Sequence, residues 1–285
     1  MMSESVRQCS SIGFIRFLSG KYPSCLVIVG CILFLYTLAE PYWLKIKRVE
    51  ICNSEIPDSF VGTRIVFLAD LHHGPCFSIE RVKSVVKMVN SLKPDIILLG
   101  GDYVHQSTQY IAPVFSVLAN LKARLFKGGV LGNHDHWESA KLTRTEMKKA
   151  GITLLDNDAR WIEQKGERIR IGGVGDLWED QQFPEMTIEE VRKTDFTVLL
   201  SHNPDYFPKI RDKRIDLVLS GHTHGGQVTL FGLWAPIIPI GHRKYWRGYF
   251  RNVHSSLLVT TGVGTIFPPV RFFCRPEIME ITLKH

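Results

Sequence analysis

Cysteine is too sparse in this sequence, and too irregularly spaced, for a structural role. Six cysteines occur among 285 residues, no two of them in a CxxC arrangement, and three lie in or before an apolar N-terminal segment. This spacing argues against a zinc ribbon and a disulfide framework. Dense basic stretches interleaved with aromatic residues are also lacking, although the formal net charge is +7. We therefore expect no nucleic-acid partner. The net charge suggests an anionic partner or an anionic membrane surface, but because the basic residues are scattered, a solvated basic surface is favoured for most of them.

Charge is absent from one long stretch at the N-terminus. Ser24 to Ala39 contains no charged residue, and the segment 22–44 reaches the roughly 20 residues of a membrane-spanning helix. Basic residues flank it on both sides, so the positive-inside rule leaves its orientation open. A retained anchor is preferred to a cleaved signal peptide, for which Thr37-Leu38-Ala39 would be the cleavage site. We predict an anchor and juxtamembrane segment over residues 1–48 and one soluble domain over 49–285.

Internal repeats and low-complexity linkers are lacking in the rest of the chain, where apolar β-branched runs alternate with helical patterns. Apolar stripes predict helices at 78–92 and 111–122. Strands are predicted at 64–71, 95–99, 125–131, 160–164, 168–174, 196–201, 216–220, 257–261 and 277–283. The alternation predicts an α/β fold with two sheets face to face and helices outside.

Five short polar motifs stand at the ends of predicted strands. They are Asp70-Leu71-His72, Gly101-Asp102, Gly132-Asn133-His134-Asp135, Ser201-His202 and Gly221-His222-Thr223-His224. Because the carboxyl ends of parallel strands meet at one edge of a sheet, we expect these side chains to converge. A single motif of this length is weak evidence, but five at strand ends are not explained by turns alone. Oxygen and imidazole donors without thiolates suit Mn, Fe or Zn.

The order of these motifs resembles that of the calcineurin-like metallophosphoesterases, over about residues 64–285. The resemblance implies a four-layer α/β/β/α sandwich and two divalent metal ions, with manganese preferred and iron, zinc or magnesium as alternatives. The ligands it implies are Asp70, His72 and His224 for the first metal, Asn133, His202 and His222 for the second, and Asp102 as the bridge. It also implies that His134 is not a ligand but a general acid, which Asp135 would orient.

Such a pair of cations suits phosphoester hydrolysis. Two cations about 3.5–4 Å apart lower the pKa of a bound water and clamp the phosphoryl oxygens, and an acid such as His134 can protonate the leaving oxygen.

Residues outside the motifs have more than one possible role. The cations Arg243, Lys244 and Arg247 follow the fifth motif and could bind a substrate phosphate or a lipid headgroup, or lie in a solvated loop. His73, His105 and His136 are either pocket-lining or surface residues. The stretch 267–273 is apolar enough to pack against lipid, but a core role for its phenylalanines is favoured.

The N-terminal segment and two later stretches resemble one branch of this family in particular. Together with Gly262-Val263-Gly264 and Arg275-Pro276-Glu277-Ile278, the single anchor resembles the membrane-associated YkuE/YaeI-like branch. That branch includes membrane-anchored UDP-2,3-diacylglucosamine pyrophosphatases of lipid A biosynthesis. The resemblance implies a bacterial inner-membrane enzyme, its domain in the cytoplasm, that hydrolyses this lipid-linked nucleotide to UMP and lipid X, a lipid monophosphate. The alternatives are a phosphodiesterase on another envelope or nucleotide substrate, with its domain outside the cytoplasm, and a non-catalytic scaffold.

Overall fold

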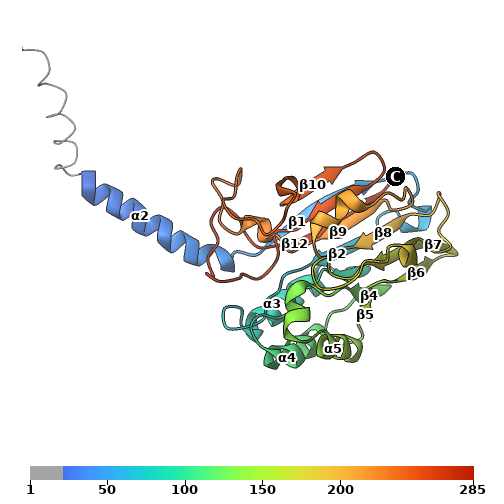
Figure 1. The fold of residues 1–285 in the computed structure, drawn as a ribbon, viewed down its shortest axis with the longest axis horizontal. Coiled ribbons are helices and arrows are strands. Elements are labelled where there is room, and N and C mark those ends of the chain that lie inside the picture. Colours follow the sequence, from blue (N-terminus) through green and yellow to red (C-terminus); the bar gives the residue numbers. More distant parts are fainter. Residues whose placement is uncertain (1–21) are drawn as a thin grey trace, which may run out of the picture.

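The structure of the protein is a computed structural model, and it describes residues 22–285. The apolar N-terminal segment forms helix α2 (Tyr22–Ala39), which continues into the short helix η1 (Glu40–Tyr42). The stretch Cys25–Tyr42 is long and apolar enough to cross a membrane, and 11% of it is buried. Figure 1 shows α2 standing out from the rest of the molecule. The first 21 residues of the predicted anchor segment lie outside the described part of the chain.

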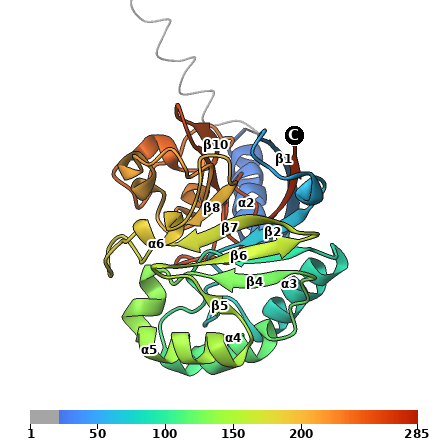
Figure 2. The same cartoon turned by 90° about the vertical axis from the view of Figure 1, so that its right-hand side faces the viewer.

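Two six-stranded sheets make up the body of the molecule (Figures 1 and 2). The first sheet has the order β1 (Lys45–Cys52), β12 (Glu277–Lys284), β2 (Arg64–Leu68), β3 (Ile96–Leu99), β4 (Phe126–Gly129), β5 (Thr153–Leu154). The second has the order β10 (Gly248–Arg251), β11 (Ser256–Val259), β9 (Leu217–Ser220), β8 (Thr197–Leu200), β7 (Glu167–Gly173), β6 (Asp158–Gln164). β2 to β5 are parallel to one another, as are β7, β8, β9 and β11.

Three longer helices cover the outer face of the first sheet. They are α3 (Ile79–Ser91), α4 (Ile111–Leu118) and α5 (Asn133–Lys149), the last kinked at Ser139. The second sheet is covered by short elements, including α6 (Glu185–Ile188) and η4 (Pro204–Lys209). The remaining short helices are η2 (Asp58–Phe60), η3 (Thr108–Tyr110), η5 (His224–Gly226) and η6 (Arg243–Tyr245).

The main core lies between the sheets, where side chains such as Phe67, Leu98 and Ile171 are fully buried. A second core lies under α3, whose predicted stripe of valines is buried. Apolar strands buried on both faces are what a parallel sheet between two covering layers requires. The predicted fold of two facing sheets with helices outside is confirmed.

Some predicted elements differ from the structure. The helix predicted at 111–122 ends at Leu118, and β1, β5 and β10 were not expected. The sequence of β1 is typical of a basic juxtamembrane stretch, because charged residues lie among its apolar ones. In the fold, Lys45 and Arg48 of β1 pair with Glu277 and Glu280 of β12, at 3.2 and 2.9 Å. The predicted division of the chain between residues 48 and 49 falls inside this strand.

Candidate metal centre

The five motifs meet at one edge of the two sheets, because each follows a strand that ends there. β2, β3 and β4 of the first sheet and β8 and β9 of the second lead into them. Backbone hydrogen bonds join the loops: the Asp70 N–H donates to Gly101 O at 2.9 Å, and the Gly221 N–H to His202 O at 2.9 Å. Residues as far apart in the sequence as Asp70 and His222, 152 positions, are thereby brought together, as the parallel topology predicts.

Asp70, His72 and His224 form the first group of possible ligands. One ligand atom from each lies within 4.8 Å of the others, and all three residues are buried. The Nε2 atoms of His72 and His224 are 2.9 Å apart, and His224 Nε2 is 3.9 Å from Asp70 Oδ1. These are the three residues predicted for the first metal.

Asp102, His202 and His222 form the second group, also within 4.8 Å of one another. Asp102 Oδ2 lies 3.2 Å from His202 Nε2, and the same oxygen lies 3.4 Å from His72 Nε2 of the first group. Asp102 therefore stands between the two groups, where a bridging ligand is expected. Its assignment as the bridge, like the other ligand assignments, stays a prediction.

Two histidines of the second group are oriented by backbone carbonyls. His202 Nδ1 lies 2.6 Å from Gly100 O, and His222 Nε2 lies 3.0 Å from Pro239 O. In each ring the nitrogen beside the carbonyl must carry a proton, so in the neutral form of the ring the other nitrogen has its lone pair directed at the group. Metal-ligating histidines are held in this way by a hydrogen bond on the far side of the ring.

Two buried oxygen atoms of the predicted ligands have no hydrogen-bond partner. They are Asp70 Oδ2 and Asn133 Oδ1. A buried polar atom left unpaired costs about 1–3 kcal/mol, so these two oxygens need an explanation. The donor set of carboxylates, imidazoles and one amide oxygen fits divalent metal ions of the Mn, Fe and Zn type. We conclude that the residues present suit such ions.

The charge states of the histidines differ. Burial is outweighed at His202 by the neighbouring Asp102 carboxylate, which raises the pKa of this imidazole well above its usual value. Burial lowers the pKa of His72 and His224, and it lowers that of His222 to about 3, so these imidazoles are neutral, the form that binds metal. Burial raises the pKa of Asp70 to about 7. A cation beside this carboxylate would stabilise its charged form and offset the effect of burial.

The backbone at the motifs is strained. Five of the seven predicted ligands have a left-handed φ: Asp70 (56°), His72 (47°), Asp102 (56°), His222 (67°) and His224 (51°). This conformation is uncommon for residues with a Cβ, and it persists only where the surrounding structure enforces it. Such strain gathers at functional sites because side chains must be turned toward a common point.

Two glycines make room for the carboxylates. A Cβ on Gly132 would lie 2.3 Å from Asp102 Oδ1, and a Cβ on Gly221 would lie 2.6 Å from Asp70 Oδ2. Neither contact is possible for a real carbon atom. The glycines of the third and fifth motifs are therefore required by the close approach of the ligands from other loops.

The third motif begins a helix, which the sequence did not reveal. Gly132 is the N-cap of α5, and Asp135 is its third residue, with Oδ2 accepting the Gly132 N–H at 2.9 Å. Asp135 also accepts the N–H groups of Asp102 and Tyr103, at 2.8 and 2.9 Å. The expected orientation of the His134 imidazole by Asp135 stays a prediction: no hydrogen bond joins the two side chains among the described residues, and both oxygens of Asp135 accept backbone N–H groups.

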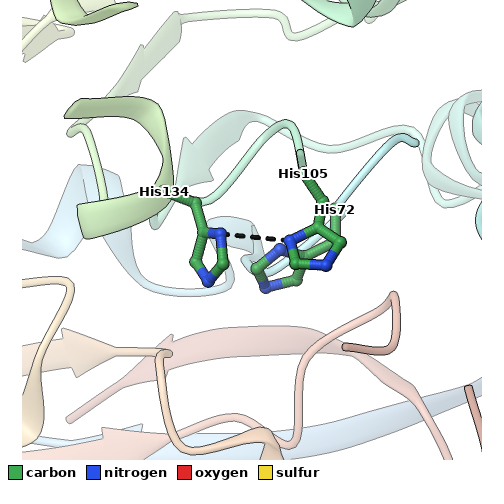
Figure 3. A group of neighbouring side chains, drawn as sticks. All are labelled: His72, His105 and His134. Carbon is green, nitrogen blue, oxygen red and sulfur yellow. Dashed lines mark hydrogen bonds between the residues drawn. The ribbon is translucent and has the colours of Figure 1, made fainter. Parts of the chain in front are cut away.

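His134 instead faces His105. Their Nδ1 atoms are 3.1 Å apart, and the His134 ring centroid lies 4.7 Å from that of His72. Figure 3 shows the three imidazoles converging from three separate segments. His105 was expected only as a pocket-lining or surface residue, and its place beside His134 had no signal in the sequence except its nearness to the second motif.

The remaining candidate histidines and basic residues have different surroundings. His73 is buried, with Nδ1 2.8 Å from Phe77 O, which is a structural role. His136 lies in a separate group with Asp156 and Asp180. The loop with Arg243, Lys244 and Arg247 is joined to the fifth motif, because the Thr223 hydroxyl donates to Trp246 O at 2.6 Å. The guanidinium groups of Arg243 and Arg247 donate to the carbonyls of Ala235 and Gly232.

The side chain of Arg271 is hydrogen-bonded to the backbone beside the first group of possible ligands. It is fully buried, and its guanidinium donates to the carbonyls of Gly264, Thr261 and Cys274, at 2.7, 2.8 and 2.9 Å. A further contact of 3.5 Å reaches His224 O. This role was not predictable from the sequence, because a lone arginine in an apolar stretch is usually a surface residue.

The chain is similar to known phosphoesterases over most of its length. Residues 63–226, which contain all five motifs, match the family model for calcineurin-like phosphoesterase. The metallophosphoesterase YkuE of Bacillus subtilis (strain 168) is 33% identical over 250 residues, 86% of this chain and 87% of the relative. The phosphodiesterase YaeI of Escherichia coli (strain K12) is 33% identical over 248 residues, 86% of this chain and 90% of the relative.

A third relative is described as a transmembrane protein. A transmembrane protein with a metallophosphoesterase domain from Danio rerio is 31% identical over 275 residues, 90% of this chain and 62% of the relative. The family match covers more than half of the chain, and the relatives carry the same activity class in their names. The chain belongs to the calcineurin-like phosphoesterase family and is a metal-dependent phosphohydrolase.

Proposed function

We propose that the protein hydrolyses a phosphoester or pyrophosphate bond of a membrane lipid, with UDP-2,3-diacylglucosamine as substrate and UMP and lipid X as products. The observation that carries this proposal is the position of α2. Its C-terminal end packs against the loop that follows the site: Tyr36 contacts Phe272 and Phe273, with ring centroids 5.6 and 5.4 Å apart. An anchor joined to the domain in this way would hold the metal centre close to the bilayer, where acyl chains keep such a substrate.

The site residues have the chemistry that this reaction requires. Two divalent ions, with manganese preferred, would supply positive charge for the phosphoryl oxygens and activate water. Asp70, His72 and His224 would hold one ion, Asn133, His202 and His222 the other, and Asp102 both. His134, beside this group, would donate a proton to the leaving oxygen.

The basic loop would provide the contact with the remainder of a pyrophosphate substrate. Lys244 lies over the ring of Tyr245 at 5.5 Å and is exposed, which leaves its ammonium group available to a second phosphate or a lipid headgroup. The loop is joined to the fifth motif through Thr223. Loss of charge at Lys244 would therefore weaken substrate binding rather than metal binding.

The location in the cell follows from the substrate. The proposal places α2 in a bacterial inner membrane and the domain in the cytoplasm, where nucleotide sugars are made. A reporter fused after His285 tests this topology. Activity of the reporter outside the cytoplasm would contradict the UDP-linked substrate and favour another phosphodiester of the envelope.

The test is an assay of the purified full-length protein with Mn²⁺ on UDP-2,3-diacylglucosamine and on bis(p-nitrophenyl) phosphate. We expect turnover of both, with UMP released from the first, and loss of both in Asp102→Ala. Turnover of the generic ester alone would contradict the lipid substrate. Turnover of neither would favour a scaffold, and full activity of Asp102→Ala would contradict the site.

A further inference from the structure

An apolar cavity of about 350 Å³ lies beside the fifth motif. It is lined by the segments 223–228 and 236–239 and by Ile266, Phe267 and Pro268. Its walls carry Val228, Ile237 and Phe267, and the one titratable side chain among its lining residues is the imidazole of His224. Its size is near the lower end of the roughly 300–1,000 Å³ of ligand pockets, so it suits a slender apolar group rather than a whole lipid.

Gln227 holds the two walls of the cavity together. Its side-chain amide donates to Ile266 O and Pro268 O, at 3.1 and 2.9 Å, and its Oε1 accepts the Ile266 N–H at 3.0 Å. Gln227 is 8% exposed and follows the fifth motif by three residues. The cavity is therefore built by a buried hydrogen-bonded residue and is not a gap between independent loops.

The lining of the cavity includes residues of the metal centre and its support. His224, a predicted ligand of the first metal, lines it directly. Pro239, on the other wall, accepts the hydrogen bond from His222 at 3.0 Å. A chain lying in the cavity would thus end beside both groups of ligands, where the phosphoester of the same molecule would be cleaved.

The outer side of the cavity is apolar and continuous with the base of α2. Ile237 and Phe267 are 78% and 75% exposed, and Leu233 on the same loop is 83% exposed. Several large apolar side chains exposed to this extent are uncommon on a surface that faces only water.

Phe272 and Phe273 join the wall of the cavity to the helix. The Phe272 N–H donates to Gln227 O at 3.0 Å, and the ring of Tyr36 in α2 lies 5.6 Å from that of Phe272 and 5.4 Å from that of Phe273. The Arg271 N–H also donates to Thr37 O at 3.1 Å. The cavity mouth and the membrane-length helix are thereby parts of one connected surface.

We propose that this cavity binds a hydrocarbon chain of the substrate, which enters from the bilayer along the surface formed by Leu233, Ile237 and Phe267. The inference rests on the proposed function, since it assigns the lipid part of the substrate to a place on the protein. The cavity would contribute to substrate binding. The hydrocarbon chain would contact the walls of the cavity in place of water or lipid, while the phosphoester is positioned at the metal centre.

The experiment measures kcat/KM for p-nitrophenyl alkyl phosphodiesters with ethyl, butyl, hexyl and octyl groups, using the full-length protein in lipid nanodiscs with Mn²⁺. We expect kcat/KM to rise about fourfold per added methylene until the cavity is filled. Ile237→Glu should reduce this slope toward zero. Val253→Glu is the matched control, since Val253 is 86% exposed and does not line the cavity, and it should keep the slope of the unmodified protein.

A slope of zero in the unmodified protein, or equal slopes in Ile237→Glu and Val253→Glu, would overturn the inference. If a second copy of the chain covers these loops instead, Ile237→Glu will convert a dimer to a monomer without any chain-length effect, which also overturns it. UDP-2,3-diacylglucosamine turnover separates this inference from the proposed function. Equal turnover by both variants would refute the cavity assignment alone, while a chain-length slope without UMP release would refute the UDP substrate alone.

Discussion

The carboxylate of Asp135 accepts the backbone N–H of Asp102 at 2.8 Å, which joins the third motif to the second. The same oxygen accepts the Gly132 N–H, and the other oxygen accepts that of Tyr103. Asp135 therefore fixes the loop that carries the central carboxylate of the site. In this arrangement its hydrogen bonds hold the backbone of the predicted bridging ligand Asp102, while the imidazole of His134, the predicted proton donor, contacts His105.

This relationship predicts the effect of Asp135→Asn. An amide has one acceptor oxygen and would place its NH₂ against a backbone N–H, so at least one of the three hydrogen bonds is lost. We expect the Mn²⁺ affinity to fall about 10- to 100-fold, the usual effect of removing a group that orients a ligand. Isothermal titration with Mn²⁺ measures this.

His134→Gln is the comparison variant. Loss of a general acid costs about 10²- to 10⁴-fold, and the cost should be larger for an alkyl alcohol leaving group than for p-nitrophenol, with Mn²⁺ affinity unchanged. If Asp135→Asn shows the same leaving-group dependence and normal Mn²⁺ affinity, Asp135 acts through His134 after all.

Gly132→Ala should remove activity through a single methyl group. The new Cβ would meet Asp102 Oδ1 at 2.3 Å and His202 Cε1 at 2.7 Å, so both ligands must move. A displacement of this size costs on the order of a hundredfold in kcat/KM. Gly166→Ala is the control: it has φ +83° but no atom within 4 Å, so we expect a loss of about 1 kcal/mol in stability with normal turnover. Equal activity losses in the two variants would contradict a local effect at the metal centre.

The two sheets and the meeting of the motifs were predictable from sequence because each relies on a repeated signal. Apolar runs mark the strands, and parallel strands bring their ends to one edge, so Asp70, Asp102 and His202 could be expected to converge. Helix α5 gave a weaker signal, since its first turn is polar and it is kinked at Ser139. Arg271 and the His105–His134 contact depend on tertiary packing between loops, for which a single sequence carries no periodic pattern.

Arg271→Met should destabilise the domain strongly. The guanidinium is fully buried and its carbonyl partners would be left without donors. We expect a loss of about 3–5 kcal/mol in the free energy of unfolding, together with weaker Mn²⁺ binding because the backbone of His224 is among the contacts. Arg192→Met is the control, since that side chain is 72% exposed in its ion pair with Asp195, and it should change stability by about 1 kcal/mol or less. Similar melting temperatures for the two variants would contradict the role given to Arg271.

The stability of the metal-free protein should depend on the ionisation of Asp156. This side chain is 4% exposed and accepts the Leu131 N–H at 2.9 Å, just before the third motif. Burial raises its pKa to about 6, above its value in the unfolded chain. The contribution of the protonated form is fully present below about pH 4 and is lost as the pH rises to about 6.

The difference in melting temperature between the protein and Asp156→Asn isolates this group. With EDTA present, the difference should change between pH 4 and 6 in favour of the variant, and should be constant above pH 7. A difference that is constant from pH 4 to 7 would show that the carboxyl titrates normally.

The most direct test of the account is the metal content of the purified protein together with its activity. After removal of metal with a chelator and titration with Mn²⁺, we predict two ions per chain and full return of bis(p-nitrophenyl) phosphate hydrolysis. In Asp102→Ala we predict fewer than two ions and a loss of kcat/KM on the order of a thousandfold, because Asp102 stands between the two groups of ligands. Full activity of the metal-free protein, or two tightly bound ions with normal turnover in Asp102→Ala, would contradict the metal centre described above.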